Sequence, residues 1–183
     1  PAAAGDLVAT AVNTFGDLTY AVNNAAIGLP ATPMHEVTEA DWRRMCSVTL
    51  DGVYFGMQAQ LRHMSAVGSG AIVNTASVGG LRPVAGLSPY VAAKHAVVGL
   101  TRQAALEYVD SGVRINAVAP GLTATPRFNS LPDDVRASLA GSQAGGRAAT
   151  PDDVAGAIVF LLSPDASHVN GDVLMVENGV TQR

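Results

Sequence analysis

Residues 71–80 of the chain read AIVNTASVGG, and this stretch decides the fold. Its first six residues form an apolar run that is too short for a helix, and Ser77 and a pair of glycines close it. A short apolar run that ends in this way is typical of a buried strand in a parallel sheet. The stretch therefore predicts a strand at 71–76, with Ser77 at its carboxyl end.

Helical and strand patterns alternate on both sides of this strand. Apolar residues recur at intervals of three and four in the longer segments, and short apolar runs separate them. We expect strands at 18–22, 71–76, 113–118 and 173–176, and helices at 5–15, 38–66, 89–110, 132–140 and 150–162. This alternation predicts an α/β fold, a doubly wound, Rossmann-like parallel sheet with helices on both faces.

Two of the helices have clear start signals. The spacing of Thr38 and Asp41 resembles a capping box, and Thr150 precedes a proline that suits the first helical position. Asp152 and Asp153 follow that proline. We interpret this carboxylate pair as compensation of the helix dipole and not as an acid/base pair.

The composition indicates one well-packed domain with a small-molecule partner. The chain has 183 residues, of which 48% are hydrophobic and 14% are charged. The formal net charge of −4 argues against nucleic acid or an anionic membrane as a partner, because both demand a basic face. No apolar run reaches the ~20 residues that span a bilayer. We expect a cytoplasmic protein.

Neither a disulfide nor a metal site is expected. Cys46 is the only cysteine, so no disulfide can form within the chain. The four histidines show no helical pairing and no neighbouring carboxylate in a ligand pattern.

Tyr90 and Lys94 are four residues apart, so they lie on the same face of the predicted helix, one turn apart. An ammonium beside a phenol favours the phenolate, which predicts a lowered pKa for Tyr90. Such a tyrosine could give or take a proton near neutral pH. With the hydroxyl of Ser77, the pair forms a candidate site for a carbonyl or an alcohol.

The carboxyl ends of the predicted strands gather the other candidate residues. Asn23-Asn24, Ser77 and Pro120-Gly121 each follow a strand, and ligands of parallel sheets bind at this edge. The longest irregular stretch, 121–150, also begins there. A stretch of that length beside a cleft is typical of a lid over the substrate.

Several of these motifs together resemble the short-chain dehydrogenase/reductase family. Residues 23–26 (NNAA) resemble its Asn-Asn-Ala-Gly turn, and Ser77 with Tyr90-x-x-x-Lys94 matches its catalytic serine and its Tyr-x-x-x-Lys motif. Residues 116–125 (NAVAPGLTAT) resemble its Pro-Gly segment, and 147–153 and 171–179 resemble its last helix entry and last strand. The resemblance covers nearly the whole chain.

The resemblance implies an NAD- or NADP-dependent oxidoreductase that interconverts a ketone and a secondary alcohol. Tyr90 would be the acid/base, Ser77 would hold the substrate oxygen, and Lys94 would bind the nicotinamide ribose. The implied cofactor contacts are Asn23, Ala25, Tyr90, Lys94, Pro120, Gly121, Thr123 and Thr125. The resemblance also implies a homodimer or homotetramer.

The chain departs from the family at two places. It lacks the glycine-rich phosphate loop, so we expect residues 1–183 to be the C-terminal three-quarters, roughly, of a single domain within a longer protein. The segment that selects NAD or NADP lies in the missing part. Thr49 stands where relatives generally carry an asparagine that is thought to hold a water of the proton relay, which predicts a differently wired relay.

Other interpretations remain open at this point. The chain could be a non-catalytic binding or scaffold protein that keeps the fold. Tyr90 and Lys94 taken alone could be an ordinary surface pair, and Asn23 and Asn24 could merely stabilise a turn. A serine hydrolase is a distant third possibility, because no GxSxG motif surrounds Ser77.

Overall fold

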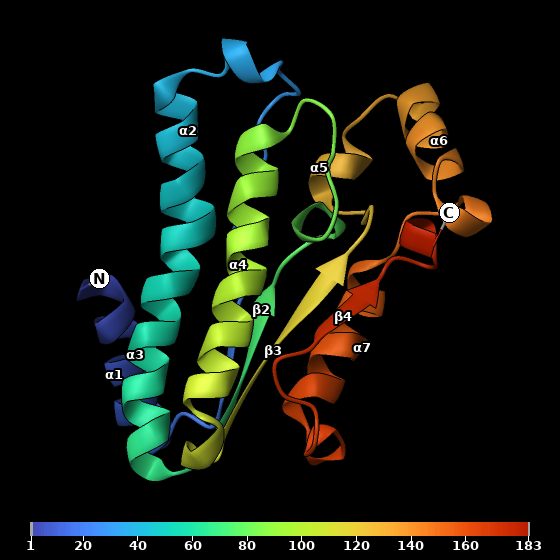
Figure 1. The fold of residues 1–183 in the computed structure, drawn as a ribbon. Coiled ribbons are helices and arrows are strands. Elements are labelled where there is room, and N and C mark those ends of the chain that lie inside the picture. Colours follow the sequence, from blue (N-terminus) through green and yellow to red (C-terminus); the bar gives the residue numbers. More distant parts are fainter. Residues whose placement is uncertain (1, 183) are drawn as a thin grey trace.

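The computed structural model describes residues 2–182, and its centre is a sheet of four parallel strands (Figure 1). The strands are β1 (Tyr20–Asn23), β2 (Gly70–Thr75), β3 (Val113–Pro120) and β4 (Val173–Val176), in the order β1-β2-β3-β4. Val73 of β2 is paired with Val22 on one side and with Asn116 on the other. The predicted parallel sheet is confirmed, with strand bounds shifted by at most two residues.

Helices cover both faces of this sheet (Figure 1). The helices are α1 (Ala2–Phe15), α2 (Glu39–Met45), α3 (Gly52–Val67), α4 (Ser88–Glu107), α5 (Pro126–Asn129), α6 (Asp133–Gly141) and α7 (Pro151–Leu162). α3 and α4 pack on one face, α1 lies against α3, and α7 packs on the opposite face. None of these helices has the length and hydropathy that crossing a membrane requires.

Alternation along β2 and β3 divides the core into two layers. Ile72 and Ile115 face α3 and α4, whereas Val73 and Val118 face α7 and contact Leu161. Successive side chains of a strand point to opposite faces, so continuous apolar runs are needed to fill both layers. This explains why apolar residues occur on both faces of β2 and β3.

The helix expected at 38–66 is interrupted by one wider turn. Thr38 caps its start by accepting a hydrogen bond from the Asp41 amide at 3.1 Å, which is one half of the predicted capping box, and its hydroxyl donates to the Asp41 carboxylate at 2.7 Å. Between α2 and α3 the backbone forms a π-helical segment, Cys46–Asp51, which contains Thr49. An apolar spacing of three and four residues does not reveal such a turn, because the flanking helices keep their own periodicity.

The edge formed by β1 is open in the described part of the chain. Tyr20 is 52% exposed and Val22 is 42% exposed, and Val159 on the neighbouring surface of α7 is 64% exposed. The exposure of these large apolar side chains shows that no described residue covers the sheet face that carries α7 next to β1.

Candidate active site

Ser77 and the helix α4 meet at the carboxyl end of β2. Ser77 is 8% exposed and accepts a hydrogen bond from the amide of Gly79 at 3.1 Å, which starts a short 3₁₀ turn. A Cβ at Gly79 would lie 3.3 Å from the Tyr90 ring and 3.6 Å from the Ser77 hydroxyl. The turn therefore packs directly against the phenol, and the structure brings Ser77 and Tyr90 together as predicted.

Lys94 is a buried cation beside this phenol. It is the only lysine in the sequence and is 2% exposed. Its Nζ donates a hydrogen bond of 2.5 Å to the carbonyl oxygen of Thr75 and lies 5.8 Å from the centre of the Tyr90 ring. Burial disfavours the charged form and lowers the pKa of Lys94 to about 8.

The pKa of Tyr90 moves in the opposite direction to the one that we predicted. Burial raises the pKa of the phenol above its ordinary value, and a hydrogen bond with Ser77 opposes that rise only in part. The ammonium of Lys94 approaches the ring and does not dominate at the hydroxyl. The predicted lowering by Lys94 is therefore wrong in this structure, and Tyr90 is protonated at neutral pH.

A cavity of about 710 Å³ opens in front of these three residues. Its lining includes the strand ends, the start of α4 and one face of α7: Val22, Asn24, Ala26, Thr75, Ser77, Tyr90, Lys94, Pro120, Gly121, Thr123, Thr125, Pro151 and Val159. The predicted residues Pro120, Gly121, Thr123 and Thr125 all lie on its wall. The structure thus joins both groups of predicted residues in one cavity.

The lining suits a large ligand with both apolar and polar groups. The hydroxyl of Thr75 is buried at the wall and has no hydrogen-bond partner among the described residues. Lys94 uses one of its three donors on the carbonyl of Thr75. A buried hydroxyl without a partner costs about 1–3 kcal/mol, so polar groups of a ligand would be stabilising here.

Asn23 and Ala25 are not part of this lining, and their neighbours Asn24 and Ala26 take that place. The Asn23 amide group points into the protein, where it donates to Gln60 at 3.0 Å and to Asn74 at 2.8 Å and accepts from Gln60 at 2.9 Å. Side chains alternate along β1, so two consecutive asparagines cannot both face the cavity. The alternation of side chains therefore could have indicated from the sequence that only one of the two asparagines lines the cavity.

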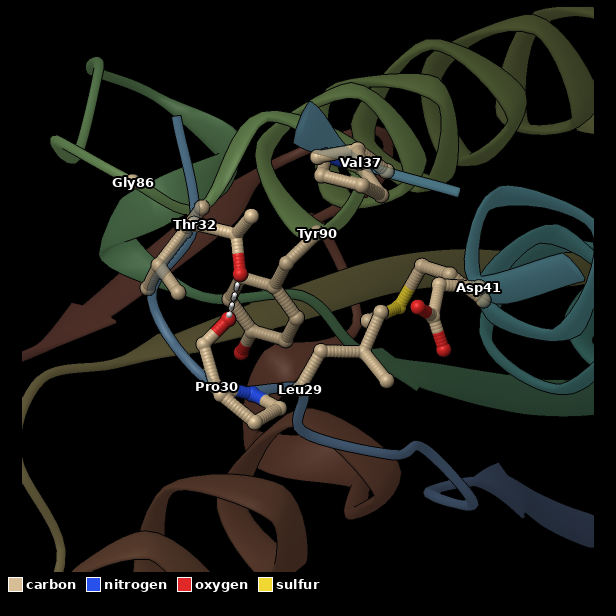
Figure 2. Close-up of a pocket in the computed structure, with 10 residues that line it drawn as sticks. Leu29, Pro30, Thr32, Val37, Asp41, Gly86 and Tyr90 are labelled. Carbon is tan, nitrogen blue, oxygen red and sulfur yellow. Dashed lines mark hydrogen bonds between the residues drawn. The ribbon is translucent and has the colours of Figure 1, made fainter. Parts of the chain in front are cut away.

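A second, smaller cavity of about 100 Å³ also borders Tyr90 (Figure 2). Ten residues line it: Leu29, Pro30, Thr32, Val37, Asp41, Met45, Gly86, Leu87, Pro89 and Tyr90. The Thr32 amide donates to the Gly86 carbonyl at 2.9 Å, which joins two loops that are distant in sequence. Leu87 contributes an apolar side chain to this cavity, whereas Leu122 contributes one to the large cavity.

The comparisons with known proteins agree with this geometry. A family model described as "Enoyl-(Acyl carrier protein) reductase" matches residues 1–181. The cis-4-hydroxycyclohexanecarboxylate dehydrogenase of Sinomonas cyclohexanicum is 49% identical over 96% of this chain and 70% of its own length. The cyclohexanol dehydrogenase of Acinetobacter sp. (strain SE19) is 43% identical over 94% of this chain and 68% of its own length.

Solved structures of similar proteins have the same fold. The crystal structure of levodione reductase superimposes with a TM-score of 0.93 at 36% identity, covering 98% of this chain and 72% of that one. ElxO with NADP bound gives a TM-score of 0.94 at 35% identity, covering 98% and 74%.

The chain belongs to the short-chain dehydrogenase/reductase family. It is an NAD(P)-dependent oxidoreductase that interconverts a ketone and a secondary alcohol by hydride transfer. An enzyme with NAD or NADP is therefore favoured over the scaffold interpretation.

In this short-chain dehydrogenase/reductase, Thr49 occupies the position where we expect an asparagine. Its side chain is fully buried in the π-helical segment. The hydroxyl accepts a hydrogen bond from the Ile27 amide at 3.3 Å and donates to the Met45 sulfur at 3.2 Å. Thr49 thus connects the loop after β1 to the wall of the smaller cavity, since Met45 lines that cavity.

Residues 121–150, the predicted lid of this short-chain dehydrogenase/reductase, connect the end of β3 to the start of α7. The Ala149 amide donates to the Leu122 carbonyl at 2.9 Å, and the Ala124 amide donates to the Ala149 carbonyl at 2.8 Å, so the two ends of the segment are joined. The helix expected at 132–140 is confirmed as α6, and α5 was not expected. The capping residue of α5 is Thr125, whose hydroxyl accepts from the Phe128 amide at 3.4 Å.

Proposed function

We propose that this enzyme acts on alicyclic secondary alcohols and ketones, with Tyr90 as its acid/base. One observation carries this proposal: Tyr90 lies on the wall of both cavities. Tyr90 borders the large cavity together with Ser77 and Lys94, and it borders the small, mostly apolar cavity as well. A group placed between a cofactor and a substrate has this position.

The large cavity is the proposed seat of the nicotinamide cofactor. Lys94, Thr75 and the segment from Pro120 to Thr125 would hold it there, and the bound nicotinamide would supply or accept the hydride. Ser77 would donate a hydrogen bond to the substrate oxygen. In reduction Tyr90 would give its proton to that oxygen, and in oxidation it would take the proton from the hydroxyl.

The raised pKa of Tyr90 suits the reductive direction at neutral pH. A phenol that keeps its proton is ready to donate it to a carbonyl oxygen. Lys94, whose pKa is lowered to about 8, still carries its charge in most molecules at pH 7 and would favour the phenolate that donation leaves behind.

The small cavity and the relatives support the proposed substrate class. Leu29, Pro30, Val37, Met45 and Leu87 give the cavity an apolar wall, and its volume of about 100 Å³ suits a compact group. Two relatives are named for cyclohexanol and for hydroxycyclohexanecarboxylate, and both substrates are six-membered rings that bear a secondary alcohol.

A spectrophotometric assay of the full-length gene product would test this function. We expect formation of NADH or NADPH when cyclohexanol is added with NAD⁺ or NADP⁺, and much slower formation with hexan-1-ol, a primary alcohol of equal carbon number. Equal rates with both alcohols would contradict the substrate class. Cofactor binding without turnover of any alcohol or ketone would instead support a non-catalytic protein.

The open edge of β1 supports a proposal about the domain. Tyr20, Val22 and the cavity-lining Val159 leave an apolar surface that a further strand and helix would cover. We propose that residues 1–183 are the C-terminal part of one domain and that the covering elements complete the cofactor site.

The outer surface of α3 and α4 supports a proposed homodimer or homotetramer. Tyr54 on α3 is 45% exposed and lines a groove of about 290 Å³ between the helices, and Leu106 on α4 is 72% exposed. We expect Leu106→Glu to lower the mass measured by light scattering to that of a smaller assembly, because it would bury a charge at the interface. Leu7→Glu on α1, where Leu7 is 70% exposed, is the matched control. An unchanged mass in Leu106→Glu would contradict this interface.

A further inference from the structure

Arg127 connects the predicted lid to the loop that follows β1. It lies on α5, and its Nη1 donates a hydrogen bond to the carbonyl oxygen of Gly28 at 3.2 Å. The two residues are 99 positions apart in the sequence. The contact holds a guanidinium between the two segments that flank the active site.

The absence of a side chain at Gly28 leaves room for this close approach. A Cβ built on Gly28 would lie 2.6 Å from Nη1 of Arg127 and 3.3 Å from its Cζ. Any other residue would push the guanidinium away from the loop. Gly28 and Arg127 therefore fit each other at this place.

The charge of Arg127 is not neutralised by a carboxylate among the described residues. Arg43, Arg136 and Arg147 each pair with an aspartate or glutamate. Among residues 2–182 the Arg127 guanidinium has one hydrogen bond, to the Gly28 carbonyl, so most of its five N–H donors remain for another acceptor. A guanidinium with free donors is well suited to bind a carboxylate in a bidentate manner.

Residues that line each cavity lie within two sequence positions of Gly28 or Arg127. Thr125, two residues before Arg127, lines the large cavity, and Leu29 and Pro30, which follow Gly28, line the small one. Figure 2 shows Pro30 and Asp41 on different sides of the small cavity, with Tyr90 on the wall between the loops. Arg127 is not itself among the lining residues, but its bond to Gly28 places a positive charge next to the loop that lines the small cavity, whereas Asp41 places a carboxylate on the cavity wall.

We propose that Arg127 binds a carboxylate on the ring of the substrate, so that the enzyme selects hydroxy- and oxocycloalkane carboxylates. This inference rests on the proposed function, because it places the reacting oxygen of the ring at Tyr90. A carboxylate that pointed toward Asp41 would meet a like charge, and one that pointed toward Arg127 would meet its complement. Arg127 is a specificity-determining residue and takes no part in the proton transfer.

The test compares two substrates in the full-length enzyme and its variants. We expect Arg127→Gln to lower kcat/KM for cis-4-hydroxycyclohexanecarboxylate by about 10- to 100-fold, the effect of one lost charged hydrogen-bond pair. For cyclohexanol, kcat/KM should change by less than about twofold, because no charge is recognised. Arg102→Gln, which removes an exposed arginine from α4, is the matched control and should change neither value.

The dependence of kcat/KM on salt concentration is a second measurement, and partial unfolding of the variant would not produce the expected result. In the wild type, kcat/KM for the carboxylate should fall as the ionic strength rises, and Arg127→Gln should abolish that dependence. An equal loss with both substrates, or no loss with the carboxylate, would overturn the inference. A wild type that oxidises cyclohexanol and ignores the carboxylate would overturn it too, yet would leave the proposed function intact. Failure with both substrates would refute the function itself.

Discussion

Replacing Tyr90 by phenylalanine is expected to lower kcat of the full-length enzyme by about a thousandfold, in line with the ~10²- to 10⁴-fold contribution of a positioned acid or base. The change removes the phenol oxygen and leaves the ring. Because the ring packs against the Gly79 turn, its place in the fold should be kept. Binding of the cofactor in the large cavity should change little, since Lys94 and Thr75 remain there.

The measurement has two parts, turnover of cyclohexanol and titration of the cofactor by its fluorescence. Tyr108→Phe is a matched control, because it removes a phenol oxygen at the far end of α4. Substantial turnover in Tyr90→Phe with normal kinetics would remove Tyr90 from the role of acid/base. Loss of cofactor binding in the same variant would show that the change disturbed the site and not the chemistry alone.

Replacing Lys94 by methionine is expected to abolish most activity and to stabilise the fold at neutral pH. Burial lowers the pKa of Lys94 from 10.5 to about 8, so the folded chain binds this proton less tightly than the unfolded chain. Keeping the charge buried then costs about 3 kcal/mol below pH 8. Loss of the hydrogen bond to the Thr75 carbonyl offsets part of the gain, which leaves about 1–2 kcal/mol.

The sign of the pH dependence separates this effect from ordinary repacking. Between pH 8 and pH 10.5 the unfolded chain holds a proton that the folded chain has released, so the stability of the wild type rises with pH across this window. Lys94→Met lacks that rise, and its advantage should therefore shrink as the pH increases. Urea denaturation at neutral pH and at pH ~10 measures both values.

Arg62→Met is the control for Lys94→Met, because it removes an exposed cation from α3. It should follow the wild type at both pH values. A Lys94→Met protein that is less stable than the wild type at neutral pH, or whose relation to the wild type does not change with pH, would contradict the buried-charge argument.

The framework of the fold could be predicted because each signal is local. The apolar run at 71–76 became β2, and the proline after Thr150 marked the start of α7, where the structure shows a full capping box between Thr150 and Asp153. Ser77, Tyr90 and Lys94 could be predicted because local geometry places them. Ser77 follows the end of a strand, and Tyr90 and Lys94 lie one helical turn apart.

The remaining features depend on contacts between distant segments. The smaller cavity requires residues 29–45 and 86–90 to meet, and no local pattern records that meeting. The π-helical turn around Thr49 is invisible in the apolar spacing that flanks it. The pKa of Tyr90 was predicted from one neighbour, whereas burial from all sides decides its direction.

The burial of a single lysine also has a practical consequence for labelling. Residues 1–183 contain one lysine side chain, and its pKa of about 8 gives it a sizeable fraction of neutral amine under mildly alkaline conditions. Reagents that acylate neutral amines therefore have one lysine target in these residues, on the wall of the large cavity, and its 2% exposure should make the reaction slow. Peptide mass spectrometry of the acylated protein would then report occupancy of the cofactor site directly, because a ligand that covers Lys94 blocks the modification.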